Sequence, residues 1–215
     1  MKGIIHRIKL LKIFVQVVKN PEKTELIFNA VDLLSQNPEN MRTIQVIEAR
    51  LMHKPGFQNL YDERYEAPRV TLASLQTLPL DSFGHALYKH LHDNNLDWDL
   101  FPKIVATRPI EYLAQKIYAD HDLWHTLLDY GSSVEDELAL QAFGVAQYGS
   151  PLGCVLIAGG LLHLLRKDPS RAVTALEKIS EGYRRGHQVP FLLGLKIYEM
   201  LDHPLDEVRR ELRMY

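Results

Sequence analysis

The residues best suited to do chemistry lie in the stretch 121–137, which reads HDLWHTLLDYGSSVEDE. His121 and His125 are four residues apart, so on a helix their imidazoles lie on one face and can share a metal ion. Asp122 lies about 100° round the helix from His121, and Asp129 is expected to return to the same sector two turns further along. The spacing therefore predicts a helix that presents imidazoles and carboxylates in one sector.

A further carboxylate follows the break that residues 131–133 (GSS) are expected to make between two helices. Glu137 then lies in the first turn of the next helix and can be brought back toward the two histidines. Two imidazoles with two carboxylates form a mixed nitrogen and oxygen site that suits zinc, manganese, iron or magnesium. Two simpler interpretations stay open: such a pair arises easily by chance among ten histidines, and the acids at 135–137 favour any helix N-terminus.

A second histidine cluster carries much less information. His85 and His92 share a helix face but lie roughly 10 Å apart along the axis, and His85 and His90 point about 140° apart. Only His90 and Asp93 are spaced so that their side chains can meet, and two ligands do not make a metal site.

Other enzyme classes are disfavoured by the residues present. A zinc protease of the H-E-x-x-H type needs a glutamate where this chain has Asp122. The dyad of His121 and Asp122 also occurs in phosphohydrolases, but two residues are a weak signal. No phosphate-binding loop, serine nucleophile motif or dinucleotide fingerprint is present, and Cys154 lies in an apolar run where a thiol is usually inert.

The elements that must position these residues read as helices throughout. Proline directly after a capping residue marks most of the expected helix starts, and no strand-like alternation is long enough to compete. We therefore predict an all-α fold: a single-domain, multi-helix globule (1–215), in which 109–148 form the candidate metal-binding helix pair. The expected helices are 1–20, 21–34, 38–52, 79–93, 109–130, 134–148, 151–165, one from 169 stopped by Gly186, one from 190 and a short one from 204, with a long polar loop at 54–69.

Composition fits this prediction and excludes some partners. The 215 residues are 46% hydrophobic and 24% charged, with a formal net charge of −2. That near-balance argues against nucleic acid as a partner, because phosphate binding needs a basic face. A single cysteine excludes an intramolecular disulfide and suits a reducing compartment.

Two segments are relevant to membrane binding. Residues 1–20 form a basic amphipathic pattern without the features of a secretion signal, so they are expected to pack as a first helix or to lie on an anionic membrane surface. The apolar run 151–165 is too short to span a membrane, and it is expected to be a buried core helix. We therefore expect a cytoplasmic protein, or one bound peripherally to the inner face of a membrane.

The sequence from about residue 25 onward resembles a known family, the coenzyme Q (ubiquinone) biosynthesis proteins that are fourth in the COQ naming series. The family signature is H-D-x-x-H, eleven residues and Glu, which is matched here by His121, Asp122, His125 and Glu137. The likeness extends to three flanking stretches, LPLDSFGHALY at 78–88, ELALQAFGVAQYGSP at 137–151 and PLDEVRREL at 204–212.

Four positions depart from the family pattern. Tyr118 and Ala119 stand where an Arg-Glu pair is usual, Asp136 replaces a glycine, and Gln141 replaces a lysine. The resemblance therefore indicates a divergent member whose native substrate can differ from the family's.

The resemblance implies an all-helical protein that binds a divalent metal, zinc or magnesium, through His121, Asp122, His125 and Glu137. It implies removal of the C1 carboxylate from a 4-hydroxy-3-methoxy-5-polyprenylbenzoate, alone or coupled to hydroxylation at that carbon. The implied partners are this prenylated quinone precursor or a prenyl phosphate lipid, other quinone-biosynthesis proteins, a membrane surface and a second copy of the chain.

A prenyl tail needs a long apolar channel. The candidate walls are Gly159 and Gly160 in the run 151–165, and the stripe Phe83, Leu87 and Leu91, although ordinary core is the simpler interpretation of that stripe. Two other functions remain open: a non-catalytic prenyl-lipid carrier or scaffold, and a hydrolase that acts on a phosphate ester.

Overall fold

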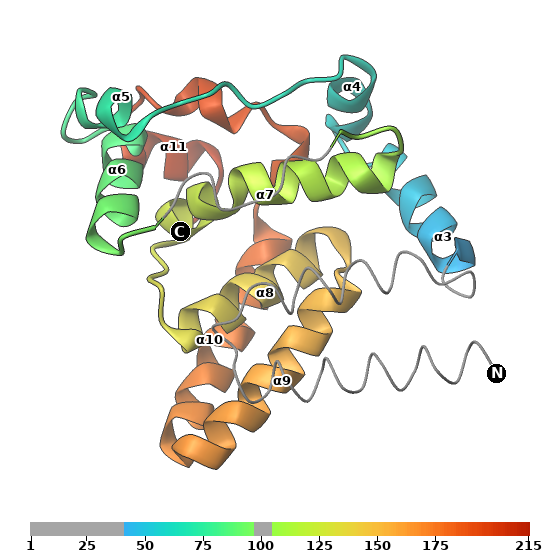
Figure 1. Ribbon diagram of the computed structural model, residues 1–215, viewed down its shortest axis with the longest axis vertical. Helices are drawn as coiled ribbons and strands as arrows, with labels where there is room; N and C mark the ends of the chain where they lie inside the picture. The colour runs from blue at the N-terminus through green and yellow to red at the C-terminus, as the bar shows by residue number, and fades with distance from the viewer. Residues whose placement is uncertain (1–40, 97–104) are drawn as a thin grey trace. The chain divides into compact units, whose positions relative to one another are not determined.

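The computed structural model describes residues 41–96 and 105–215. Within these ranges the chain forms nine α-helices and two short 3-10 helices, without a β-strand (Figure 1). The all-α prediction is therefore confirmed for the described residues. The predicted helices at 1–20 and 21–34 lie outside them. The chain divides into two compact units with a boundary inside α3 (Met41–Met52), and each unit is described by itself.

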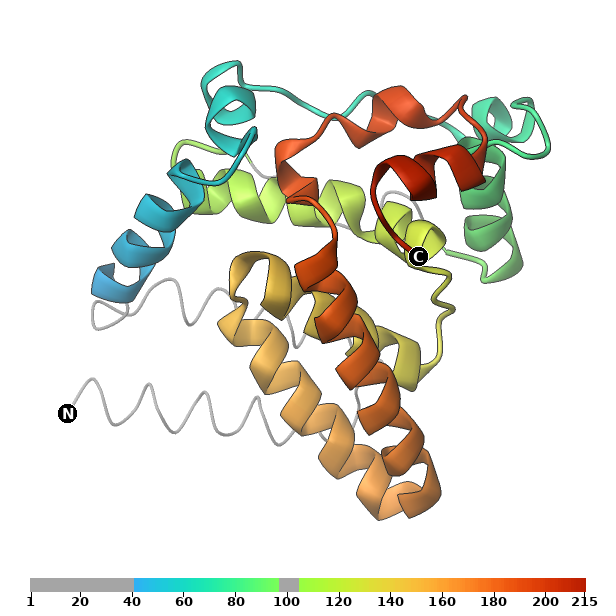
Figure 2. The same cartoon turned by 180° about the vertical axis from the view of Figure 1, so that it is seen from behind.

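The first unit is built around three helices that lie side by side in Figures 1 and 2, namely α8 (Val134–Tyr148), α9 (Pro151–Lys167) and α10 (Pro169–Gln188). The hydroxyl of Ser133 caps α8 by accepting from the backbone N–H of Asp136, and Ser150 caps α9 in the same way. Proline occupies the first position of both α9 and α10. The helix starts predicted from capping residues and proline are thus confirmed here.

Close backbone contact between α8 and α10 defines the core of the first unit. A Cβ atom added to Gly182 would lie 2.2 Å from the carbonyl oxygen of Ala139. Gly186, predicted to stop the helix, instead lies inside α10 against the carbonyl oxygen of Phe143. That prediction was wrong, because this glycine serves close helix packing rather than a left-handed helix end.

The helix α9 is less buried than its apolar sequence indicated. Val155, Leu162 and Leu165 are 40%, 46% and 53% exposed, while Leu164 is only 1% exposed. The prediction of a buried core helix at 151–165 was therefore wrong: one face packs against the core and the other meets solvent.

The second unit is arranged along α7 (Pro109–Leu128), the candidate metal helix. The other elements of this unit are α4 (Phe57–Asp62), α5 (Leu72–Gln76), α6 (Phe83–Asp93), the 3-10 helices η2 (Leu192–Gly194) and η3 (Ile197–Met200), and α11 (Leu205–Glu211). Figure 2 shows α6 and α11 side by side, consistent with backbone hydrogen bonds that join Phe83 to His203 and Leu205 to Asp81.

Several boundaries in this unit differ from prediction for tertiary reasons. The predicted loop 54–69 contains α4, a helix too short to be recognised from periodicity but stabilised by burial of Phe57 and Leu60. The helix predicted from Pro79 begins at Phe83, where Ser82 caps it. The helix predicted from Pro190 is replaced by η2 and η3, and α5 was not predicted at all.

Replacing Gly182 with alanine tests the contact between α8 and α10. The new methyl group would press on a backbone carbonyl that cannot move independently, so we expect the free energy of unfolding to fall by about 1–3 kcal/mol. Chemical denaturation followed by circular dichroism measures this change. Ser180→Ala, at an exposed position of the same helix, is the matched control and should leave stability within about 0.5 kcal/mol of wild type. Equal stability of the two variants would contradict the close packing.

Candidate metal centre

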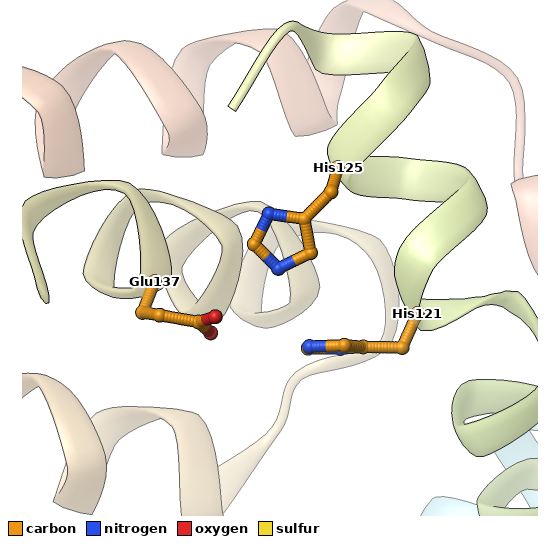
Figure 3. Close-up of side chains that lie close together, drawn as sticks. All are labelled: His121, His125 and Glu137. Carbon is orange, nitrogen blue, oxygen red and sulfur yellow. The ribbon is translucent and has the colours of Figure 1, made fainter. Parts of the chain in front are cut away.

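His121 and His125 lie one turn apart on the same face of α7, as predicted (Figure 3). Their ring centroids are 4.9 Å apart and the rings meet edge to face. His125 is almost fully buried, with 2% of its surface exposed, and His121 is half-buried. A histidine pair held this closely on a rigid helix can supply two nitrogen ligands to one metal ion.

A backbone carbonyl orients the His125 ring. Its Nδ1 atom lies 3.3 Å from the carbonyl oxygen of Tyr130. A carbonyl oxygen can only accept a hydrogen bond, so Nδ1 is the donor in this contact, and in the neutral ring the lone pair then lies on Nε2. This arrangement is typical of metal-binding histidines, in which the second nitrogen is oriented by a backbone carbonyl.

Glu137 belongs to the first unit, in the first turn of α8, where its N–H donates to the carbonyl oxygen of Ser133 at 2.9 Å. Ser132, the residue before Ser133, belongs to the second unit, where its hydroxyl donates to the side-chain oxygen of Asn94 at 2.8 Å. His121 and His125 in the second unit and Glu137 in the first unit are the candidate ligands among the described residues, and Figure 3 draws their side chains.

The other two predicted acids have different surroundings. Asp122 is half-buried on α7 and is not part of the ligand set found among the described residues. Asp129 does not return to the histidine sector, because α7 ends at Leu128 and Asp129 adopts the left-handed conformation with φ of 60°. Its side chain is 93% exposed, so the expectation that it shares the histidine sector was wrong.

The spacing of His90 disfavoured it as a metal ligand, yet its ring, on α6, stacks on the ring of His125, on α7. The ring centroids are 5.2 Å apart and the ring planes differ by 19°. Spacing rules compare residues within one helix, so no signal in the sequence connects positions 90 and 125. His92, by contrast, contacts Asp93 at 3.1 Å on the surface.

A hollow of about 260 Å³ in the second unit borders this imidazole stack. It opens beside the C-terminal end of α7 and could admit part of a small polar ligand. The residues that line it include His90, Asn94, His125, Thr126, Tyr130 and Arg209.

A buried ion pair lies on α7 in the turn that directly precedes His121. The ammonium of Lys116 is 2.9 Å from the carboxylate of Asp120, and the two side chains are 2% and 0% exposed. Burial raises the pKa of the Asp120 carboxyl above its ordinary value, and the neighbouring ammonium of Lys116 opposes this rise only in part. Sequence reasoning missed this pair, although a lysine and an aspartate four residues apart were visible.

One departure from the family pattern has a clear structural role. The carboxylate of Asp136 accepts hydrogen bonds from the hydroxyl of Ser133 and from the ammonium of Lys178. This acid therefore completes the N-terminal cap of α8 and joins α8 to α10 within the first unit.

The predicted channel residues lie in close-packed surroundings. Phe83, Leu87 and Leu91 are 0%, 0% and 1% exposed and belong to the core of the second unit. Gly159 and Gly160 are buried in the first unit, where a Cβ on Gly160 would lie 2.5 Å from the side chain of Leu138. These contacts explain the residues as packing positions, and their role as channel walls stays a prediction.

Arg209 fixes the C-terminal end of α7. Its guanidinium donates to the carbonyl oxygens of Leu127 and Thr126, each at 3.0 Å. Arg209→Met leaves these carbonyls without that donor, so we expect a loss of about 1.5–3 kcal/mol in the free energy of unfolding. Urea denaturation of this variant beside Arg210→Met, whose side chain is 66% exposed, provides the test. A loss of the same size in both variants would show that Arg209 has no special role.

Within the described residues, none of the helices combines the length and the apolar character that crossing a membrane requires.

Comparison with known proteins gives a consistent result. The family model described as coenzyme Q (ubiquinone) biosynthesis protein Coq4 matches residues 12–215. A curated relative, the ubiquinone biosynthesis protein COQ4 homolog 2 of Paramecium tetraurelia, is 26% identical over 178 residues, which are 80% of this chain and 82% of the relative. The mitochondrial COQ4 homolog of Danio rerio is 27% identical over 93% of this chain and 73% of its own length.

The mitochondrial homolog of Bos taurus is 27% identical over 80% of this chain, and the match spans 65% of that relative's length. Among solved structures, a putative ubiquinone biosynthesis protein of Nostoc punctiforme is similar with a TM-score of 0.82 and 25% identity. That similarity covers 97% of this chain and 98% of the other.

Proposed function

Because the chain belongs to the Coq4 family of coenzyme Q (ubiquinone) biosynthesis proteins, we propose that it binds a divalent metal and a polyprenylated quinone precursor and removes the precursor's C1 carboxylate. The proposed substrate is a 4-hydroxy-3-methoxy-5-polyprenylbenzoate. The observation that carries the proposal is the imidazole pair of α7, in which a backbone carbonyl orients the buried member.

The proposed metal ligands are His121, His125 and Glu137, with Asp122 as a fourth ligand. Two imidazoles favour zinc over magnesium, which prefers oxygen ligands. When bound, such an ion supplies Lewis acidity toward a carboxylate or phenolate oxygen. The backbone of Tyr130 keeps the His125 ring in the tautomer that such binding requires.

The proposed reaction requires a proton donor. As the bond from C1 to the carboxylate breaks, carbon dioxide leaves and the ring carbon takes up one proton, while the hydroxyl para to C1 stabilises the charged ring. An imidazole is well suited to deliver that proton near neutral pH. His90, which borders the hollow and stacks on His125, is the proposed donor.

Contact with the prenyl tail or with a membrane is proposed for the outer face of α9. Val155, Leu162 and Leu165 expose apolar surface there, and clustered exposed apolar side chains commonly mark sites of lipid or protein contact. Other quinone-biosynthesis proteins and a second copy of this chain are the further proposed partners.

Metal content tests the first part of the proposal. We expect wild-type protein dialysed against mixed divalent ions to retain close to one equivalent of metal by elemental mass spectrometry, and His125→Ala to retain little. Removal of one nitrogen ligand should cost most of the affinity while the fold persists, which circular dichroism checks. Tyr183→Ala, far along the chain on an exposed part of α10, is the control. Equal, low metal in all three proteins would refute the site.

Turnover tests the second part. Incubation of the metal-loaded protein with a prenylated 4-hydroxy-3-methoxybenzoate should release carbon dioxide, and His125→Ala should release less by a factor of about 100 or more. Tight binding of the lipid without carbon dioxide release would instead support a carrier or scaffold. Phosphate release from a generic phosphate ester would support a hydrolase.

A further inference from the structure

The ion pair of Lys116 and Asp120 is unusual for its depth. Both charged groups are nearly inaccessible, and apart from the ion-pair contact with Lys116 neither carboxylate oxygen of Asp120 has a hydrogen-bond partner among the described residues. Two charges removed from water lose hydration that their mutual attraction often fails to restore, so apolar residues of similar volume can be as stable or more so. Stability alone therefore does not account for this pair.

Through Lys116, the pair connects α7 to the segment that contains η3. The ammonium of Lys116 donates to the carbonyl oxygen of Leu195 at 3.3 Å and lies 5.4 Å from the centre of the Tyr65 ring. Close by, the hydroxyl of Tyr198 donates to the carbonyl oxygen of Ala119 at 2.6 Å. These contacts all belong to the second unit and fix one turn of α7 in a direction that hydrophobic packing, which is not directional, cannot specify.

The fixed turn ends where the candidate ligands begin. His121 directly follows Asp120, and His125 lies one turn further along the same helix. Metal coordination tolerates errors in ligand distance of about 0.2 Å. A small rotation or slide of α7 would therefore move both ring nitrogens out of reach of a common ion without unfolding the helix.

We propose that Lys116 and Asp120 are a positioning pair that sets the rotation of α7, so that His121 and His125 are presented together to a divalent metal. This inference rests on the proposed metal binding by the two histidines. The pair does not itself contact the metal.

The test replaces both charges at once, in the variant Lys116→Met/Asp120→Val, so that no unpaired charge is left buried. We expect the metal-free variant to melt at the wild-type temperature or higher, by circular dichroism. We expect its affinity for Co²⁺, measured by competition with a chelator, to fall 10- to 100-fold, the range typical of groups that orient metal ligands. The visible absorption spectrum of bound Co²⁺ should change as well, because it reports ligand geometry.

Two further variants complete the design. Glu181→Gln/Arg185→Met removes an ion pair of the same spacing on α10 and should leave Co²⁺ affinity unchanged. Lys116→Leu/Asp120→Ala also removes both charges without leaving one buried and unpaired, and it should lose affinity to the same extent; this variant decides the matter if Lys116→Met/Asp120→Val fails to fold.

Unchanged affinity and an unchanged Co²⁺ spectrum in folded Lys116→Met/Asp120→Val would overturn the positioning role and leave the metal site intact. No Co²⁺ binding by wild-type protein would overturn the metal site and the positioning role together. A loss of affinity in the control variant of α10 would also overturn the assignment, because the effect would then not be specific to α7.

Discussion

The rotation of α7 about its own axis is the constraint on which the candidate chemistry of the second unit depends. One helix carries both histidines and the buried ion pair, so a rotation of α7 moves all four side chains together. The structure holds that helix at both ends. At its start the carboxylate of Glu111 accepts hydrogen bonds from the N–H and hydroxyl of Thr107, and at its end Arg209 binds two free carbonyl oxygens.

Sequence rules were sufficient wherever a feature is local to one helix. The capping serines at 133 and 150 and the prolines that follow a cap placed the starts of α8, α9 and α10 correctly. The spacing of His121 and His125 placed both rings on one face of α7, because a helical repeat converts sequence separation directly into angle. Amphipathic periodicity and capping together also determined the all-α class over the described residues.

Several of the failures have a common cause, which is contact between residues that are distant in the sequence. Gly186 was expected to end a helix, but its small size is needed where α10 meets the backbone of α8. The short helix α4 forms because the rest of the unit buries Phe57, which no local pattern reveals. The stacking of His90 on His125 and the exposure of one face of α9 are likewise tertiary facts, absent from any window of sequence.

The departures from the family pattern acquire physical meaning when the contacts around them are considered. Asp136, in place of a small residue, is committed to a helix cap and an ion pair with Lys178. At 118 and 119 the expected charged pair is absent, while α7 buries opposite charges nearby at 116 and 120. The residues of the H-D-x-x-H and Glu signature are thus present beside charges that depart from the family pattern. If the proposed function holds, such a change is expected to alter which head group binds beside the histidines more than whether a metal binds, because both imidazoles and a carbonyl that orients His125 are present.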